Sequence, residues 1–92
     1  MQADEVSAVL KIKNVRGLHA RAAAAFAKTA EKYDADISVE RKGQEVSGQS
    51  IMGLMMLGAS IGTEIKVTCR GLDAQEALDA LEQLVNDKFH ED

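Results

Sequence analysis

The stretch VSAVLKIKNVRGLHARAAAAFAKTAEKY, residues 6–33, changes its hydrophobic period halfway along. Over Val6–Lys13, apolar residues alternate with mostly polar ones, and this period of two predicts a half-buried strand. From Ala20 to Tyr33 the sequence is rich in alanine, which favours helix strongly, and the apolar residues recur on one helical face. The stretch therefore predicts a strand and then a helix, with a turn through Gly17 between them.

The remainder of the chain continues to alternate between strand and helix patterns. Alternation around Ile37 and Val39, followed by a turn before Val46, predicts a hairpin. Further along, the patterns predict a short apolar helix after Ser50, a strand over residues 63–70, a helix opened by a capping box of Asp73 and Glu76, and a polar tail from Asn86 onward. The apolar stripe of the last helix consists of Ala77, Leu78, Leu81, Leu84 and Val85.

These elements follow the order β-α-β-β-α-β-α within one domain, residues 1–92. A chain of this length can build one small core but has no room for a second. The strands are half apolar, which suits an open sheet with one face in water and helices on the other. We therefore expect an α+β fold, an open-faced sandwich of two layers.

The charge and the aromatic content of the chain indicate which classes of molecule it can bind. The net charge is -4, and lysine and arginine never occur more than two in a row, so a basic groove for a nucleic-acid backbone is not expected. The only aromatic residues, Phe26, Tyr33 and Phe89, are too few for a platform on which bases stack. Partners should be proteins or small anions rather than nucleic acid.

The single cysteine, Cys69, falls on the apolar side of a predicted strand and has no second cysteine to pair with. We expect a small buried residue there rather than a disulfide or a cysteine-based metal site. The first residues, Met1–Glu5, lack the basic and apolar regions of a signal peptide, and no apolar run reaches the roughly 18 residues of a membrane span. These features predict a cytoplasmic protein that is not inserted in a membrane.

His19 lies at the start of the first predicted helix, and Arg21 follows in its first turn. Helix N-termini bind anions through unpaired N–H groups, here those of Ala20 and Arg21, and through the helix dipole. A guanidinium binds phosphate oxygens in a fork geometry, and a neutral imidazole is a nucleophile that can hold a phosphoryl group. We interpret the segment as a phosphate site. The simpler alternative is a capping histidine beside a solvated arginine.

Ser50 precedes the second apolar segment, and its hydroxyl could serve only as a helix N-cap. A helix start is also a position where the dipole favours an added phosphoryl group. Met52, Met55 and Met56 cannot all face inward from one short helix, so we expect some of them to form an exposed protein-binding patch. The alternative is that all three belong to the core.

No pair of carboxylates, Ser-His-Asp arrangement, metal-ligand spacing or nucleotide-binding loop stands out in the sequence. We therefore expect neither a metal nor a cofactor, and no self-contained enzyme active site. His90, in the polar tail, is assigned no role.

Two separated segments resemble the histidine-containing phosphocarrier (HPr) family of the bacterial phosphoenolpyruvate-dependent phosphotransferase system. They are GLHAR at residues 17–21 and SIMGLMMLG at residues 50–58, and the element order fits from about Val6 to Val85. The resemblance implies a four-stranded antiparallel sheet with three helices on one face. It also implies a relay protein: His19 accepts a phosphoryl group at Nδ1 from enzyme I, which obtains it from phosphoenolpyruvate, and passes it to an EIIA-type protein.

The resemblance assigns roles to the other candidate residues. Arg21 and the backbone N–H of Ala20 would stabilise the phosphoryl group, and Ser50 matches a position that an HPr serine kinase/phosphorylase modifies in some members. Leu54 and Leu57 match core positions. The face that docks enzyme I and EIIA matches Ala24, Lys28, Ile51, Met52, Met55 and Met56. We expect the carrier to be a monomer.

Two positions depart from the usual pattern of the family. Ala22 stands where proline usually follows the arginine, which restores one N–H near the site, and we expect phosphoryl transfer to survive. Gln49 stands where many members carry lysine, which weakens the case for recognition by a serine kinase. The ending, FHED at residues 89–92, is similar to the nitrogen-related branch, whose role is regulatory rather than sugar uptake.

Two other functions remain open. A regulatory binding module would use phosphorylation of His19 or Ser50 as its switch, with no obligatory onward transfer. A metal chaperone or small regulatory domain on a similar α+β sandwich is disfavoured because the sequence has no Cys-x-x-Cys pair. Transfer to an EIIA-type protein separates the carrier from the binding module, and a metal ion retained through purification would favour the chaperone.

Overall fold

The computed structural model describes residues 4–91, and in it the change of period near Gly17 is the change from the first strand to the first helix. The elements in chain order are β1 (Glu5–Lys11), α1 (Ala20–Ala30), β2 (Asp36–Arg41), β3 (Gln44–Ser47), α2 (Ile51–Met56), β4 (Glu64–Arg70), α3 (Ala74–Asn86) and a 3-10 turn, η1 (Lys88–His90). The predicted order of strands and helices is confirmed. Residues 1–3 and 92, which belong to the predicted terminal segments, lie outside the described part.

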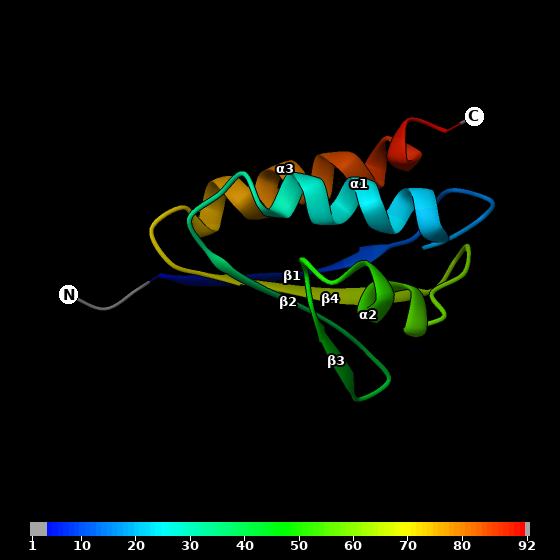
Figure 1. Cartoon of the computed structure of the whole chain (residues 1–92), viewed down its shortest axis with the longest axis horizontal. Helices are drawn as coiled ribbons and strands as arrows, with labels where there is room; N and C mark the ends of the chain where they lie inside the picture. Colours follow the sequence, from blue (N-terminus) through cyan, green and yellow to red (C-terminus); the bar gives the residue numbers. More distant parts are fainter. Residues whose placement is uncertain (1–3, 92) are drawn as a thin grey trace.

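All strand pairings in the sheet are antiparallel, and the strand order is β1-β4-β2-β3. The register places apolar residues opposite each other on the inner face: Leu10 pairs with Ile65, and Val39 pairs with Val67. Figure 1 shows α1 and α3 lying side by side along one face of this sheet, and α2 contacts α1 and β3. The predicted four-stranded antiparallel sheet with its helices is confirmed.

The core lies between the sheet and the helices and is built almost entirely from aliphatic side chains. Its largest fully buried side chains include Phe26, Ile12, Leu54, Ile65 and Leu81. Alanines on the inner face of α1 are small, so the helix backbone can approach the sheet closely. The predicted stripe of α3 is buried in full, at Ala77, Leu78, Leu81, Leu84 and Val85.

Three residues that were expected in the core, Cys69 from its strand pattern and Leu54 and Leu57 from the resemblance, are buried. Leu54 and Leu57 are buried, and Cys69 is fully buried on the inner face of β4. Burial raises the pKa of the Cys69 thiol to about 11 because the charged thiolate is disfavoured away from water. The thiol is therefore protonated at neutral pH.

Two element boundaries differ from the predicted ones. β1 ends at Lys11 rather than Lys13, because Ile12 has already left the ladder and donates its N–H to the Thr63 carbonyl, 2.9 Å away. Ile12 is nevertheless buried, which explains why the period of two continued past the strand. α1 ends at Ala30 rather than Tyr33, because the chain turns there towards β2.

The capping box predicted at the start of α3 is wrong. Asp73 is the N-cap residue, but its side chain makes no cap hydrogen bond. Its Oδ2 instead accepts a hydrogen bond from the backbone N–H of Asp34, 2.8 Å away, in the turn that leads to β2. The Asp73 carboxylate therefore makes a tertiary contact with Asp34 instead of the local hydrogen bond of a capping box.

The prediction of a polar tail from Asn86 onward is wrong at Phe89, which is buried. Lys88, Phe89 and His90 all have positive φ, at 58, 55 and 63°, and these left-handed residues turn the chain back. The turn buries Phe89 in the core, with 6% of its surface exposed. Glu91 follows directly and lies beside α1. Within residues 4–91, no helix combines the length and the apolar character needed to cross a membrane.

Candidate functional site

His19 is the N-cap residue of α1. Its backbone is extended (φ -74°, ψ -179°), and its carbonyl accepts the first helical hydrogen bond from Ala23, 2.8 Å away. Its Nδ1 accepts a hydrogen bond from the backbone N–H of Arg21, with a nitrogen–nitrogen distance of 3.3 Å. The imidazole thus takes the place of the hydroxyl or carboxylate that usually caps a helix. One ring nitrogen therefore lies against the positive end of the helix dipole.

The other ring nitrogen contacts the C-terminal segment. Nε2 of His19 lies 2.5 Å from Oε2 of Glu91, and the two side chains are 18% and 17% exposed. Hydrogen bonds from His19 and then from Asn14 lower the pKa of the Glu91 carboxyl, so it is ionised at neutral pH. The contact contributes to stability at neutral pH and is lost as the pH falls through that lowered pKa.

These two contacts determine which ring nitrogen of His19 carries the proton. An ionised carboxylate can only accept, so Nε2 must carry the hydrogen, and a backbone N–H can only donate, so Nδ1 must offer its lone pair. A doubly protonated ring would face the Arg21 N–H with a second donor. The neutral Nε2–H tautomer is the one that satisfies both neighbours, and it leaves Nδ1 as the nucleophilic atom.

The turn before the helix is fixed by Gly17, Leu18 and Asn14. Gly17 has a φ of +66°, which glycine adopts without steric cost. Leu18 donates its backbone N–H to the Ala59 carbonyl at 2.9 Å, and Nδ2 of Asn14 donates to the Gly17 carbonyl at 2.8 Å. His19 is therefore held by the two residues before it as well as by the helix after it.

Two cationic side chains border an open hollow at this helix start. The hollow has a volume of about 580 Å³ and is lined by Val15, Arg16, Arg21, His90 and Glu91. Both guanidinium groups are on exposed residues. An anion bound here would meet Arg16, Arg21 and the N–H groups of the first turn, among them that of Ala20. Arg16 is a cation that the sequence reading did not include.

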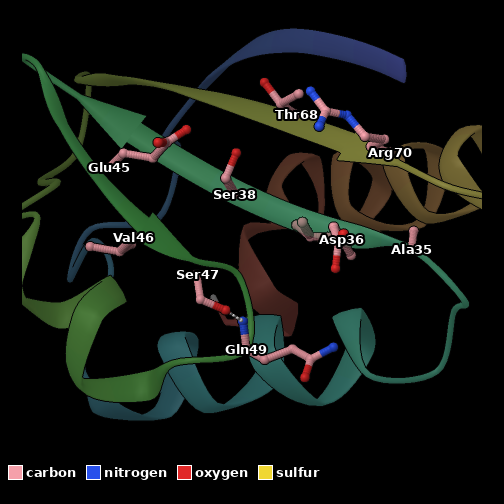
Figure 2. A pocket seen from close by; sticks show the side chains of 10 residues that line it. Ala35, Asp36, Ser38, Glu45, Val46, Ser47, Gln49, Thr68 and Arg70 are labelled. Carbon is pink, nitrogen blue, oxygen red and sulfur yellow. Dashed lines mark hydrogen bonds between the residues drawn. The ribbon is translucent and has the colours of Figure 1, made fainter. Parts of the chain in front are cut away.

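A larger hollow lies elsewhere and does not contain the predicted site. It has a volume of about 610 Å³ and is formed along β2, β3 and β4 by the residues drawn in Figure 2. Ser38 lies between the buried Ile37 and Val39, so it faces the solvent side of the sheet, and its register partners are Ser47 and Thr68. The lining is mostly polar, and none of the predicted site residues takes part.

Ser50 and the methionines lie on and around α2. Ser50 is the N-cap, and its Oγ accepts a hydrogen bond from the Gly53 N–H at 2.9 Å. The exposed fractions of Met52, Met55 and Met56 are 72%, 40% and 67%, so the alternative that all three are core residues is wrong. Ile51 is also exposed. On the neighbouring helix α1, Ala24 is half-buried and Lys28 is exposed.

Replacing Ser50 by alanine should lower the free energy of unfolding by about 1 kcal/mol, because the Gly53 N–H loses its partner. Urea unfolding followed by circular dichroism measures the change. Ser60→Ala is the matched control, since Ser60 is exposed and makes no cap. Equal midpoints for the two variants would contradict the capping role of the Ser50 hydroxyl.

Ala22 is fully buried in the first turn of α1. Besides Arg16, the site residues that sequence reasoning missed are Asn14 and Glu91. Asn14 carried no motif, and Glu91 stood only in a polar tail. Among the described residues, no group of three His, Cys, Asp or Glu side chains is placed to hold a metal ion.

The fold and the site define a class: a small open-faced sandwich that presents one imidazole at the start of a helix, beside guanidinium groups and an apolar patch. The family model described as the PTS HPr component phosphorylation site matches residues 6–87. The chain belongs to this family, the HPr phosphocarrier proteins of the phosphotransferase system.

Known relatives agree in sequence and in structure. The chain is 43% identical over 83 residues to the phosphocarrier protein HPr of Xylella fastidiosa, covering 90% of this chain and 93% of that protein. It is 42% identical to the phosphocarrier protein NPr of Shewanella violacea, covering 87% and 88%. A crystal structure of HPr from Thermoanaerobacter tengcongensis superimposes with a TM-score of 0.91 at 44% identity, covering 95% and 98%.

Proposed function

We propose that the chain is a single-domain carrier that accepts a phosphoryl group on Nδ1 of His19 from enzyme I and passes it to an EIIA-type protein. Enzyme I would obtain the group from phosphoenolpyruvate. The observation that carries the proposal is the tautomer of His19, in which Nδ1 is the free nucleophile at the helix start while Nε2 is bonded to Glu91. Membership of the family supports the same role.

The residues around His19 suit the transfer step. Phosphoryl transfer needs an in-line nucleophile and stabilisation of the equatorial oxygens rather than covalent help. As the bond between Nδ1 and phosphorus forms, the bond from phosphorus to the donor breaks, and the Arg21 N–H is released to donate to a phosphoryl oxygen. The guanidinium of Arg21 and the N–H of Ala20 would neutralise the remaining charge.

The direct test is a phosphorylation assay with phosphoenolpyruvate, purified enzyme I and this chain, followed by addition of an EIIA-type protein. A carrier takes up label from phosphoenolpyruvate only when enzyme I is present, and loses it when the acceptor is added. If phospho-His19 forms and no EIIA-type protein removes the group, the regulatory binding module replaces the carrier as the proposed function.

We propose that the apolar face of α2 docks both partners in turn. Donor and acceptor must each reach the same nitrogen, and the face lies on elements next to α1. The docking residues we propose are Ala24, Lys28, Ile51, Met52, Met55 and Met56. Flexible methionine side chains can pack against two different surfaces, which suits a protein that exchanges partners.

Replacing Met52 by aspartate should raise the KM for enzyme I roughly tenfold, equivalent to about 1.4 kcal/mol of binding free energy, with little change in stability. Met52 is 72% exposed, so its loss leaves the core intact. The matched control is Leu72→Asp, because Leu72 is 79% exposed just before α3. The docking face is rejected if the two variants have the same KM.

We also propose that Ser50 is a regulatory position. A phosphoryl group on its Oγ would place negative charge beside Ile51 and Met52 and so obstruct an apolar partner. A serine kinase/phosphorylase would be the enzyme responsible. The carrier would work in the cytoplasm, in sugar uptake or in nitrogen-related regulation, and the similarity to an NPr protein supports the second setting.

A further inference from the structure

Glu91 makes two hydrogen bonds, one with each carboxylate oxygen. Oε2 lies 2.5 Å from Nε2 of His19, and Oε1 accepts from Nδ2 of Asn14 at 3.1 Å. His19 and Asn14 lie on either side of Gly17, and Glu91 reaches them from the other end of the chain. The transfer step described above assigns no role to Asn14 or Glu91.

Asn14 is fully buried and is oriented to donate. Its Nδ2 gives one hydrogen to the Gly17 carbonyl at 2.8 Å and the other to Glu91. Its Oδ1 has no hydrogen-bond partner among the described residues. The reverse orientation of the amide would set Oδ1 against two acceptors. The arrangement that holds the Glu91 carboxylate therefore leaves Oδ1 of Asn14 without a partner. An unsatisfied buried polar atom costs stability.

Glu91 is placed by the core rather than by the ion pair alone. The left-handed turn at Lys88, Phe89 and His90 brings the chain back across the start of α1, and Phe89 anchors that turn in the core. The carboxylate is only 17% exposed. It is therefore held in position before any phosphoryl group arrives.

We propose that Glu91, held by Asn14, is a positioning residue for His19: it keeps the ring proton on Nε2 and so selects Nδ1 as the phosphoryl acceptor. The inference rests on the proposed function. When Nδ1 gives its lone pair to phosphorus, the proton stays on Nε2 and the ring becomes cationic. Glu91 faces that new charge directly. On onward transfer the electron pair returns to Nδ1 and the ring is neutral again.

The interaction with Glu91 is consequently stronger once the ring carries charge than in the free protein. An interaction that is stronger in the transition state than in the ground state lowers the reaction barrier. An interaction of equal strength in both states does not. A carboxylate behind the imidazole of a catalytic triad acts in the same two ways, by fixing the tautomer and by stabilising the imidazolium. Here the arrangement would serve a phosphoryl acceptor.

The two N–H groups that face residue 91, from His19 and Asn14, favour glutamate over glutamine. A glutamine offers one acceptor and one donor, so it would present an NH₂ group to either His19 or Asn14. It would also remove the negative charge. Aspartate keeps both acceptors and the charge but is one methylene shorter. The series Glu91→Gln and Glu91→Asp therefore separates charge and acceptor pattern from reach.

The test combines ring-nitrogen NMR of the unphosphorylated protein with the rate of phosphoryl uptake from enzyme I. In the wild type we expect a protonated Nε2 and an unprotonated Nδ1. In Glu91→Gln the Nε2 resonance should shift, the Nδ1–H tautomer should become populated, and uptake should fall by about tenfold or more. Glu91→Asp should recover part of both. Glu82→Gln, an exposed glutamate on α3, is the control and should match the wild type.

The outcomes separate this inference from the proposed function. If the Glu91→Gln protein has the wild-type tautomer and takes up phosphate as fast as Glu82→Gln, Glu91 does not position His19. A wild type in which Nδ1 carries the proton overturns the inference as well. If the wild type takes up no phosphate at all, the carrier function fails, while the NMR spectra still decide whether Glu91 sets the tautomer.

Discussion

Replacement of His19 by alanine is expected to abolish uptake of the phosphoryl group from phosphoenolpyruvate and enzyme I, with no labelled carrier detectable. The variant lacks Nδ1, which is the atom that bonds to phosphorus in the proposed transfer step. Its fold should persist, because the His19 side chain lies at the surface of the core and caps only one helix. The cost should be about 1 kcal/mol for the lost cap.

The assay follows radiolabel from phosphoenolpyruvate into the carrier, and circular dichroism checks the fold of each variant. His90→Ala is the matched control, because His90 is the other histidine and also borders the hollow at the helix start. It should be labelled at close to the wild-type rate. Labelling of His19→Ala at the wild-type rate would remove His19 from the mechanism, and loss of labelling in His90→Ala alone would make His90 the acceptor.

Replacement of Gly17 by alanine should destabilise the protein by about 3 kcal/mol or more, from left-handed strain and overpacking together. A Cβ at this position would lie 2.4 Å from the Ala59 carbonyl oxygen and 2.9 Å from the Cα of Ser60, both of which are backbone atoms. Backbone cannot move aside as a side-chain tip can. The same carbonyl accepts the Leu18 N–H, so relieving the clash would break the bond that holds the turn.

Urea unfolding of Gly17→Ala should be compared with that of Gly62→Ala. Gly62 also has positive φ, at +85°, but a Cβ there would meet no atom within 4 Å. The control should therefore lose only the conformational part, about 1 kcal/mol. Similar losses in the two variants would show that the close approach to Ala59 does not matter. A large loss in Gly17→Ala alone would confirm that the turn before His19 is sterically fixed.

Local periodicity predicted most of the fold because each strand and helix presents one face to the same core. The start of α1 at Ala20 and the position of His19 just before it followed from the change of period after Gly17. The exposure of the methionines followed from helix length, since six residues cannot turn three long side chains inward. These are short-range inferences, and the structure agrees with them.

The parts that were not predicted depend on where distant segments meet. The sequence of the tail predicts a polar segment because Phe89 is a single apolar residue without periodic apolar neighbours. The left-handed turn at residues 88–90 contains no glycine, so the sequence does not indicate a turn there. The contact of Glu91 with His19 joins two residues that are 72 positions apart in the sequence. The local sequence predicts a cap at Asp73, but the Asp34 N–H, which binds the Asp73 carboxylate instead, lies in another turn. A local sequence pattern does not indicate which distant residue a side chain will contact.

The sheet order has a consequence for the protein as it is synthesised. Among residues 4–91, β1 pairs only with β4, so β1 stays unpaired during synthesis until Glu64–Arg70 has been made. Pairings between such distant segments are slow to form, and an unpaired strand can join another chain in the meantime. The carboxylate that contacts His19 is translated later still. A chain that stops before Glu91 would contain all four strands of the sheet but would lack the carboxylate beside His19.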